Sequence, residues 1–304
     1  MAGRPGGDGV PADDEQIAMV QRVSPPRIFP TATRAGKPPM SAAGSADSYR
    51  QIGFVLGDEV EHVIAGLNFE GACAEASSGA KYRKQVVAAS LGLWSRGWLA
   101  RLQALHAIEW GNAAAAMPLV RAAVDMQAAM ALTLQTGARE WEEWLGGAPI
   151  GLAEDDHATA FAPHAFRAAE VLAADDVLGE IYRAAMALSL PHFESTLLLT
   201  GADSTAERVL MTFGDRDFHL GLAELVLGWL LALGMRQVET LRASSGVVAV
   251  ANEEQAEAWC SGTRSLLSRG DRCVVDPAER DGMPRLLVRN WRRAPGAAKK
   301  NVLM

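Results

Sequence analysis

Residues 98–125 read WLARLQALHAIEWGNAAAAMPLVRAAVD, and this stretch decides the fold. Before its Gly111-Asn112 pair, large apolar residues recur every three or four positions from residue 87 onward, which is the period of one helix face. Glycine followed by asparagine ends a helix and turns the chain. Alanine-rich sequence then continues to Gln135, with Pro118 as an alternative first turn. The stretch predicts two antiparallel helices, over 81–110 and 113–135.

The most apolar part of the chain, residues 220–235, predicts the centre of a helical bundle. It is 16 residues long and contains Glu224, whereas a membrane-spanning helix needs roughly 20 apolar residues. A helix that is apolar nearly all round also suits the core of a soluble bundle. We therefore predict a mainly α protein with a multi-helix bundle of antiparallel hairpins over 47–243, and no contact with a membrane.

The two ends of the chain differ from this bundle. The first 48 residues contain seven of the 14 prolines and no apolar stretch of signal-peptide length, so residues 1–46 are predicted to form a disordered Pro/Gly-rich tail. Near the other end, the apolar runs 247–250, 274–275 and 286–288 predict strands, and Asp281-Gly282 predicts a turn. We expect a small α+β appendage over 244–292 and a loose basic tail over 293–304.

Charge and cysteine content bear on partners and location. The net charge is −7, yet residues 260–304 hold ten basic residues and four acidic ones, so residues 1–259 carry −13. Such a basic C-terminal segment can contact RNA or another anionic partner, or it can dock on acidic helices of its own chain. The three cysteines show no CxxC spacing, which argues against a structural zinc site and fits a cytoplasmic protein.

Four charged residues on the two predicted helices form a candidate site. Arg101 and Glu109 fall on the apolar face of the first helix, and the predicted turn places Arg101 level with Arg121 and Asp125 on the second. Buried charges must be paired, because an unpaired buried ion costs several kcal/mol. The set is therefore either a structural ion network within the hairpin or a polar pocket that binds a small molecule.

The region 81–134, above all GNAAAAMPLVRAAVDMQAAMAL at 111–132, resembles an uncharacterised bacterial helical family. That family has an arginine followed four positions later by an acid, matched here by Arg121 and Asp125, and it is similar in style to HEPN domains (higher eukaryotes and prokaryotes nucleotide-binding). HEPN ribonucleases carry Arg-x4–6-His, which Arg101 and His106 match. The resemblance implies that histidine acts as general acid or base and arginine stabilises phosphate charge.

Three sets of residues have some character of metal sites, but each lacks a complete ligand set. They are Glu59 with His62, Asp175 and Asp176 with Glu180, and His157 with His164. We therefore expect no metal and no cofactor. The sequence favours a binding or assembly protein that self-associates; a metal-independent HEPN-type ribonuclease and a small-molecule enzyme or binder are the alternatives.

Overall fold

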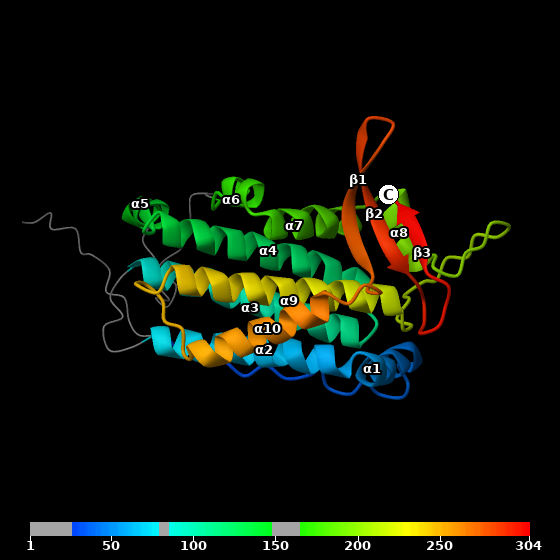
Figure 1. Cartoon of the computed structure of the whole chain (residues 1–304), viewed down its shortest axis with the longest axis horizontal. Coiled ribbons are helices and arrows are strands. Elements are labelled where there is room, and N and C mark those ends of the chain that lie inside the picture. The colour runs from blue at the N-terminus through cyan, green and yellow to red at the C-terminus, as the bar shows by residue number, and fades with distance from the viewer. Residues whose placement is uncertain (1–25, 79–84, 148–164) are drawn as a thin grey trace, which may run out of the picture.

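The computed structural model describes residues 26–78, 85–147 and 165–304, and helices dominate it (Figure 1). The predicted fold class is confirmed: a mainly α bundle with a small C-terminal sheet. Residues 1–25 of the predicted tail, residues 81–84 of the first predicted helix, and His157 and His164 lie outside the described residues. The helices of the bundle are α1 (Ala43–Val55), α2 (Gly57–Ser77), α3 (Gln85–Glu109), α4 (Ala113–Gln135), α5 (Arg139–Gly147), α6 (Ala169–Ala174), α7 (Asp176–Ser189), α8 (Phe193–Thr200) and α9 (Leu220–Ala243).

The α3–α4 hairpin forms as the sequence predicts. Gly111 has a φ of 72°, which glycine adopts without strain. Its N–H donates to Ile108 O (2.9 Å) and the Asn112 N–H donates to Ala107 O (2.8 Å), the two hydrogen bonds of a Schellman motif. The second helix starts at Ala113, so Pro118 lies inside α4 and is not its first turn.

Helix α9 is the centre of the bundle, as its composition indicates. It contacts α2, α3, α4, α7 and α10 (Glu253–Leu267), and Leu227, Leu231, Leu233 and Leu241 are fully buried. Among the described residues, α9 is the helix that is long and apolar enough to cross a membrane by length and composition. Of its most apolar window, 78% is buried inside the bundle, as expected for a core helix.

The C-terminal module comprises α10 and an antiparallel sheet of order β1-β2-β3, with β1 (Val274–Arg280), β2 (Met283–Trp291) and β3 (Lys300–Leu303). Asp281 and Gly282 both have positive φ and form the predicted hairpin turn. The sequence predicts a loose tail from residue 293, but β3 extends the sheet by pairing with β2.

The strand predicted at 247–250 is wrong. Residues 247–250 form turns and irregular chain, because side chains of α2 take backbone donors there and just beyond. The Ala249 N–H donates to Ser77 Oγ (2.8 Å), and the Ala251 N–H donates to Cys73 Sγ (3.4 Å). The segment is held by α2 instead of a neighbouring strand.

Residues 26–36, which we call the arm, lie on the bundle although the sequence places them in a disordered tail that ends at residue 46. The arm runs extended beside α2 and α3 and precedes α1 (Figure 1). Ala32 and Ala35 are buried. Residues 26–36 are therefore held on the bundle although their composition indicates a tail. Proline-rich sequence does not reveal which side chains of other helices will contact it.

Candidate functional site

Arg101 is buried in an ion pair with a residue that the sequence analysis did not identify. Its side chain comes from α3 and is only 4% exposed. Nη1 donates to Glu70 Oε1 of α2 at 2.7 Å, and Nη2 donates to Glu70 Oε2. Trp94 Nε1 also donates to Glu70 Oε2, at 2.9 Å. This two-pronged pair joins α2 to α3, and its charges compensate each other away from water.

Glu109, the last residue of α3, binds the arm. Its side chain is fully buried. Arg34 Nε donates to Oε1 at 2.7 Å, and the Ala35 N–H donates to Oε2 at 2.8 Å. Arg34 also lies over the ring of Tyr49 in α1, with 4.7 Å between the guanidinium carbon and the ring centroid. One carboxylate therefore recognises both an arginine side chain and the backbone beside it.

Three further side chains hold the backbone of the arm. Asn68 of α2 accepts from the Ala32 N–H (2.7 Å) and donates to Ala32 O (3.1 Å). His106 of α3 contacts Thr33 O through Nε2 (2.8 Å); since a carbonyl only accepts, the ring donates. We call the set that holds residues 32–36 the arm clamp; it also includes a bond from Trp110 Nε1 to Gly36 O (2.9 Å) and is made up of Tyr49, Asn68, His106, Glu109 and Trp110.

The predicted cluster of four charges does not form. Arg121 and Asp125 face α7, where Arg121 lies 5.8 Å from the Tyr182 ring centroid and 3.9 Å from the Asp125 carboxylate. Desolvation raises the pKa of Asp125, and Arg121 opposes this rise. Arg101 points toward α2 instead, so the Arg101–Glu70 pair and the Arg121–Asp125 pair lie on different sides of the α3–α4 hairpin. A helical wheel shows that a residue faces the core, but not which neighbouring helix it meets.

Arg101 and His106 make separate contacts as well. Arg101 is paired with Glu70 inside the bundle, while His106 is bonded to the arm at the surface. The ribonuclease hypothesis needs both groups on one phosphodiester. It stays a prediction, and the contacts of these two residues give it no support.

A cavity of about 430 Å³ lies between the arm, α2 and α3. Its walls are mainly apolar and include Phe29 of the arm with Leu91, Trp94, Trp98 and Leu99 of α3. Glu70 lines it too, but both oxygens of that carboxylate are already bonded to Arg101 and Trp94. Trp98 Nε1 donates to Leu67 O at 2.9 Å. The space therefore suits an apolar group, whose burial needs no new polar partner.

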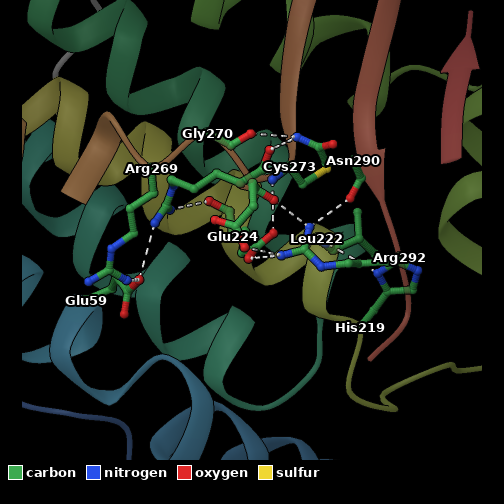
Figure 2. Close-up of polar contacts among 11 residues, drawn as sticks. Glu59, His219, Leu222, Glu224, Arg269, Gly270, Cys273, Asn290 and Arg292 are labelled. Atoms are coloured by element: carbon green, nitrogen blue, oxygen red, sulfur yellow. Dashed lines mark hydrogen bonds and ion pairs between the residues drawn. The ribbon is translucent and has the colours of Figure 1, made fainter. Parts of the chain in front are cut away.

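The C-terminal module is attached through a second buried carboxylate, Glu224 of α9 (Figure 2). Arg292 Nη2 donates to Oε1 at 2.6 Å, and the Cys273 N–H donates to Oε2 at 2.9 Å. Desolvation raises the pKa of Glu224, while these two donors and the charge of Arg272 oppose the rise. Because burial disfavours the charged form of Glu224, these donors are what stabilise its charge.

Arg272 links this attachment to α2. It donates to Glu59 Oε1 (3.3 Å) and to the carbonyl of Glu224 (2.8 Å), and Arg269 donates to the same Glu59 oxygen at 2.7 Å. Burial lowers the pKa of Arg272, and the two glutamates oppose that change. Seven of the ten basic side chains of residues 260–304 pair with described carboxylates: Arg264, Arg269, Arg272, Arg280, Arg289, Arg292 and Arg293. Four of these, Arg269, Arg272, Arg292 and Arg293, pair with acidic groups before the module, and the other three pair within residues 257–289.

The residues considered for metal sites have other partners. Glu59 binds the two arginines just described, and His62 stacks on Trp259 with 5.3 Å between ring centroids. Asp175 caps α7 through the Leu178 N–H (3.0 Å) and pairs with Arg236. Within the described ranges, no group of three or more His, Cys, Asp or Glu side chains is arranged to hold a metal ion.

An apolar surface lies on α8 and the chain that follows it, beside the C-terminal sheet (Figure 1). Phe193 is 94% exposed, and Phe213 is fully exposed. Contiguous exposed apolar groups are typical of protein, membrane or ligand contacts. The large apolar residues exposed between 190 and 213 are Leu190, Phe193, Leu197, Val209, Leu210, Met211 and Phe213.

Comparison with models of protein families, with curated proteins and with solved structures gives no match to this chain. The HEPN resemblance therefore remains a prediction, and function is argued from the geometry alone. Sequence reasoning named Arg101, His106 and Glu109, but it missed Glu70, Asn68 and the arm itself. The available signal for Glu70 was its spacing: it follows Val63 by seven residues and Leu67 by three, so it lies on the apolar face of the helix that precedes the hairpin.

Proposed function

We propose that this protein is a binding protein that holds an apolar small molecule in the cavity between the arm, α2 and α3. The observation that carries the proposal is the 430 Å³ space walled by Trp94, Trp98, Leu91 and Phe29. Small-molecule sites of roughly 300–1,000 Å³ are mostly apolar and aromatic. The carboxylate that lines it, Glu70, is already bonded to Arg101 and Trp94, which supports binding rather than catalysis.

The arm contributes to this site by closing one side of it. Residues 26–30 line the cavity, and the segment that the arm clamp holds begins two residues later, at Ala32. Gly71 of α2 allows the close approach, because a Cβ at that position would lie 2.4 Å from Pro30 Cβ. The clamp therefore positions the wall without taking up space inside the cavity.

Gly92 offers a direct test. It lines the cavity on α3, and a Cβ built there meets no atom within 4 Å. Gly92→Phe places a ring at the cavity, whereas Gly92→Ala leaves nearly all of the space. Both substitutions remove a helix-interior glycine, which favours the helix by about 1 kcal/mol for alanine and by less for phenylalanine. Gly92→Ala therefore controls for the loss of the glycine without filling the space.

The probe is N-phenyl-1-naphthylamine, a neutral apolar fluorophore whose emission rises on leaving water and which accepts energy from tryptophan. We expect saturable binding to the wild type and to Gly92→Ala, and at least about tenfold weaker binding to Gly92→Phe, which corresponds to 1.4 kcal/mol. Thermal melting confirms that all three proteins fold. Equal binding by the two variants, or no saturable binding by the wild type, contradicts the proposal.

A further inference from the structure

The arm clamp recognises an extended segment as a separate ligand would be recognised. Its hydrogen bonds go to backbone atoms of residues 32–36, and Arg34 supplies the one ion pair. Every group that makes these contacts lies on α1, on α2 or at the end of α3. None of them depends on how the arm is joined to the rest of the chain. An identical segment from another molecule satisfies them equally well.

The connection between the arm and α1, residues 37–42, has one buried residue, Pro38, while Lys37, Pro39 and Ser41 are exposed. One local hydrogen bond, from the Ala42 N–H to Pro39 O at 2.9 Å, closes a turn within it. Straightening the connection therefore gives up this turn and the burial of Pro38.

An exposed apolar side chain lies in this connection, because Met40 is 78% exposed. A straightened connection that runs to a second molecule lies beside the connection that returns from it. Such a meeting gives Met40 a cover that it lacks in the single chain.

We propose that two copies of this chain exchange arms, so that each arm clamp holds the arm of the other copy. The exchanged and the closed forms share the same clamp contacts, and the new meeting at the connections favours the dimer. Residues 26–30 then come from the second copy, so each apolar cavity is built from two chains. The inference rests on the clamp and the connection, not on what the cavity binds.

The test places a photoreactive residue on the arm. The amino acid p-benzoyl-phenylalanine is incorporated in place of Phe29, which is exposed and lies beside α3 at the cavity. This light chain is unfolded and refolded together with an equal amount of ¹⁵N-labelled wild-type chain. Irradiation then joins the arm to whichever α2 or α3 it touches, and mass spectrometry reads whether that helix is light or heavy.

Exchange predicts that about half of the crosslinked arms join a heavy helix, because mixed dimers form at random. Light scattering should then give twice the chain mass of 32.4 kDa. Crosslinks confined to light chains show that each arm stays on its own body and overturn the proposal, as does the absence of any crosslink to α2 or α3. Adding Glu109→Gln to both chains is the matched control, since it weakens the clamp and should reduce both kinds of crosslink.

This outcome is separable from ligand binding. A chain that holds its arm in place can still bind the fluorophore, and an exchanged dimer can have an empty cavity. The crosslink reports only on the origin of the arm, whereas the Gly92 pair reports only on the cavity.

Discussion

The arm and the C-terminal module are attached to the bundle by the same chemical device. In each case a buried glutamate on a bundle helix accepts from an arginine and from a backbone N–H of the docked segment. Glu109 binds Arg34 and the Ala35 N–H, and Glu224 binds Arg292 and the Cys273 N–H. Two segments from opposite ends of the chain are thus held by carboxylates that take their donors from those segments.

The two attachments differ in depth. The side chain of Arg34 is 28% exposed, while that of Arg292 is 6% exposed. The module adds a second carboxylate, Glu59, and buries Val288 and Trp291 of β2 in the common core. The arm has no secondary structure and adds small buried residues only. The same kind of ion pair is therefore supported by an apolar core at the module and by few other contacts at the arm, so we expect the arm to detach more readily.

The largest effect is expected from removing the carboxylate under the module. Glu224→Ala removes the nearer carboxylate partner of the buried Arg292 guanidinium and leaves only Asp271, at 3.8 Å, to compensate its charge. Breaking a buried ion pair costs about 3–5 kcal/mol. Urea unfolding followed by circular dichroism measures the loss. Asp276→Ala breaks an exposed pair with Arg289 in the same module, where about 0–1 kcal/mol is expected. Equal losses in the two variants would show that burial does not set the strength of this joint.

A second effect depends on pH. His219 caps α9 by accepting from the Leu222 N–H (3.3 Å), and its ring contacts Trp291 of β2 at 4.2 Å between centroids. Burial, with a contribution from Arg293, lowers its pKa from 6.5 to about 4. The unfolded chain therefore binds the proton first, and about 3 kcal/mol of stability is lost as the pH falls from 6.5 to 4.

His219→Asn keeps a capping oxygen and removes the titration. We expect its unfolding free energy to fall less than that of the wild type over this pH range, with the difference gone above pH 7 except for a constant offset. Parallel curves for the two proteins would sink the assignment of this pH dependence to His219.

A third effect, smaller than these, is expected at the attachment of the arm to Glu109. Glu109→Gln removes the charge that Arg34 pairs with, and hydrogen bonds to charged groups contribute about 1.5–3 kcal/mol. Trypsin should then cut after Arg34 faster than in the wild type, because the side chain becomes free to enter the protease. Glu143→Gln, which alters an exposed pair with Arg139, serves as the control. Unchanged cleavage in Glu109→Gln would mean that this carboxylate does not hold the arm.

The smallest effect is expected from His106→Ala, which removes one hydrogen bond to Thr33 O and costs about 1 kcal/mol. Cleavage after Arg34 should rise less than in Glu109→Gln.

The variant His106→Ala also tests the ribonuclease alternative, when an RNA pool is incubated with the wild type and with the variant in EDTA. The binding proposal expects no cleavage by either; cleavage by the wild type that is lost in His106→Ala would favour the HEPN reading instead.

Local features were predictable because their causes lie within a few residues. Gly111 and Asn112 end α3 by hydrogen bonds to residues three and five positions earlier. Asp281 and Gly282 adopt the positive φ that a two-residue hairpin requires. The period of apolar residues identified the buried face of α3, and apolar composition nearly all round identified α9 as a core helix. The strand predicted at 247–250 was wrong because its apolar run is a local feature, whereas the hydrogen-bond partners of this segment lie far away in the sequence, on α2.

The sequence by itself determined the turn between α3 and α4, the buried face of α3, and that Arg101 and Glu109 need partners. Only the tertiary structure decided which partners they meet. Glu70 lies 31 residues from Arg101, and Arg34 lies 75 residues from Glu109. Periodicity shows that a buried charge must be compensated, but the compensating group is chosen by how the helices pack. The arm is ordered for that reason: its own residues form no element, and its order comes from side chains that the folded bundle brings to it.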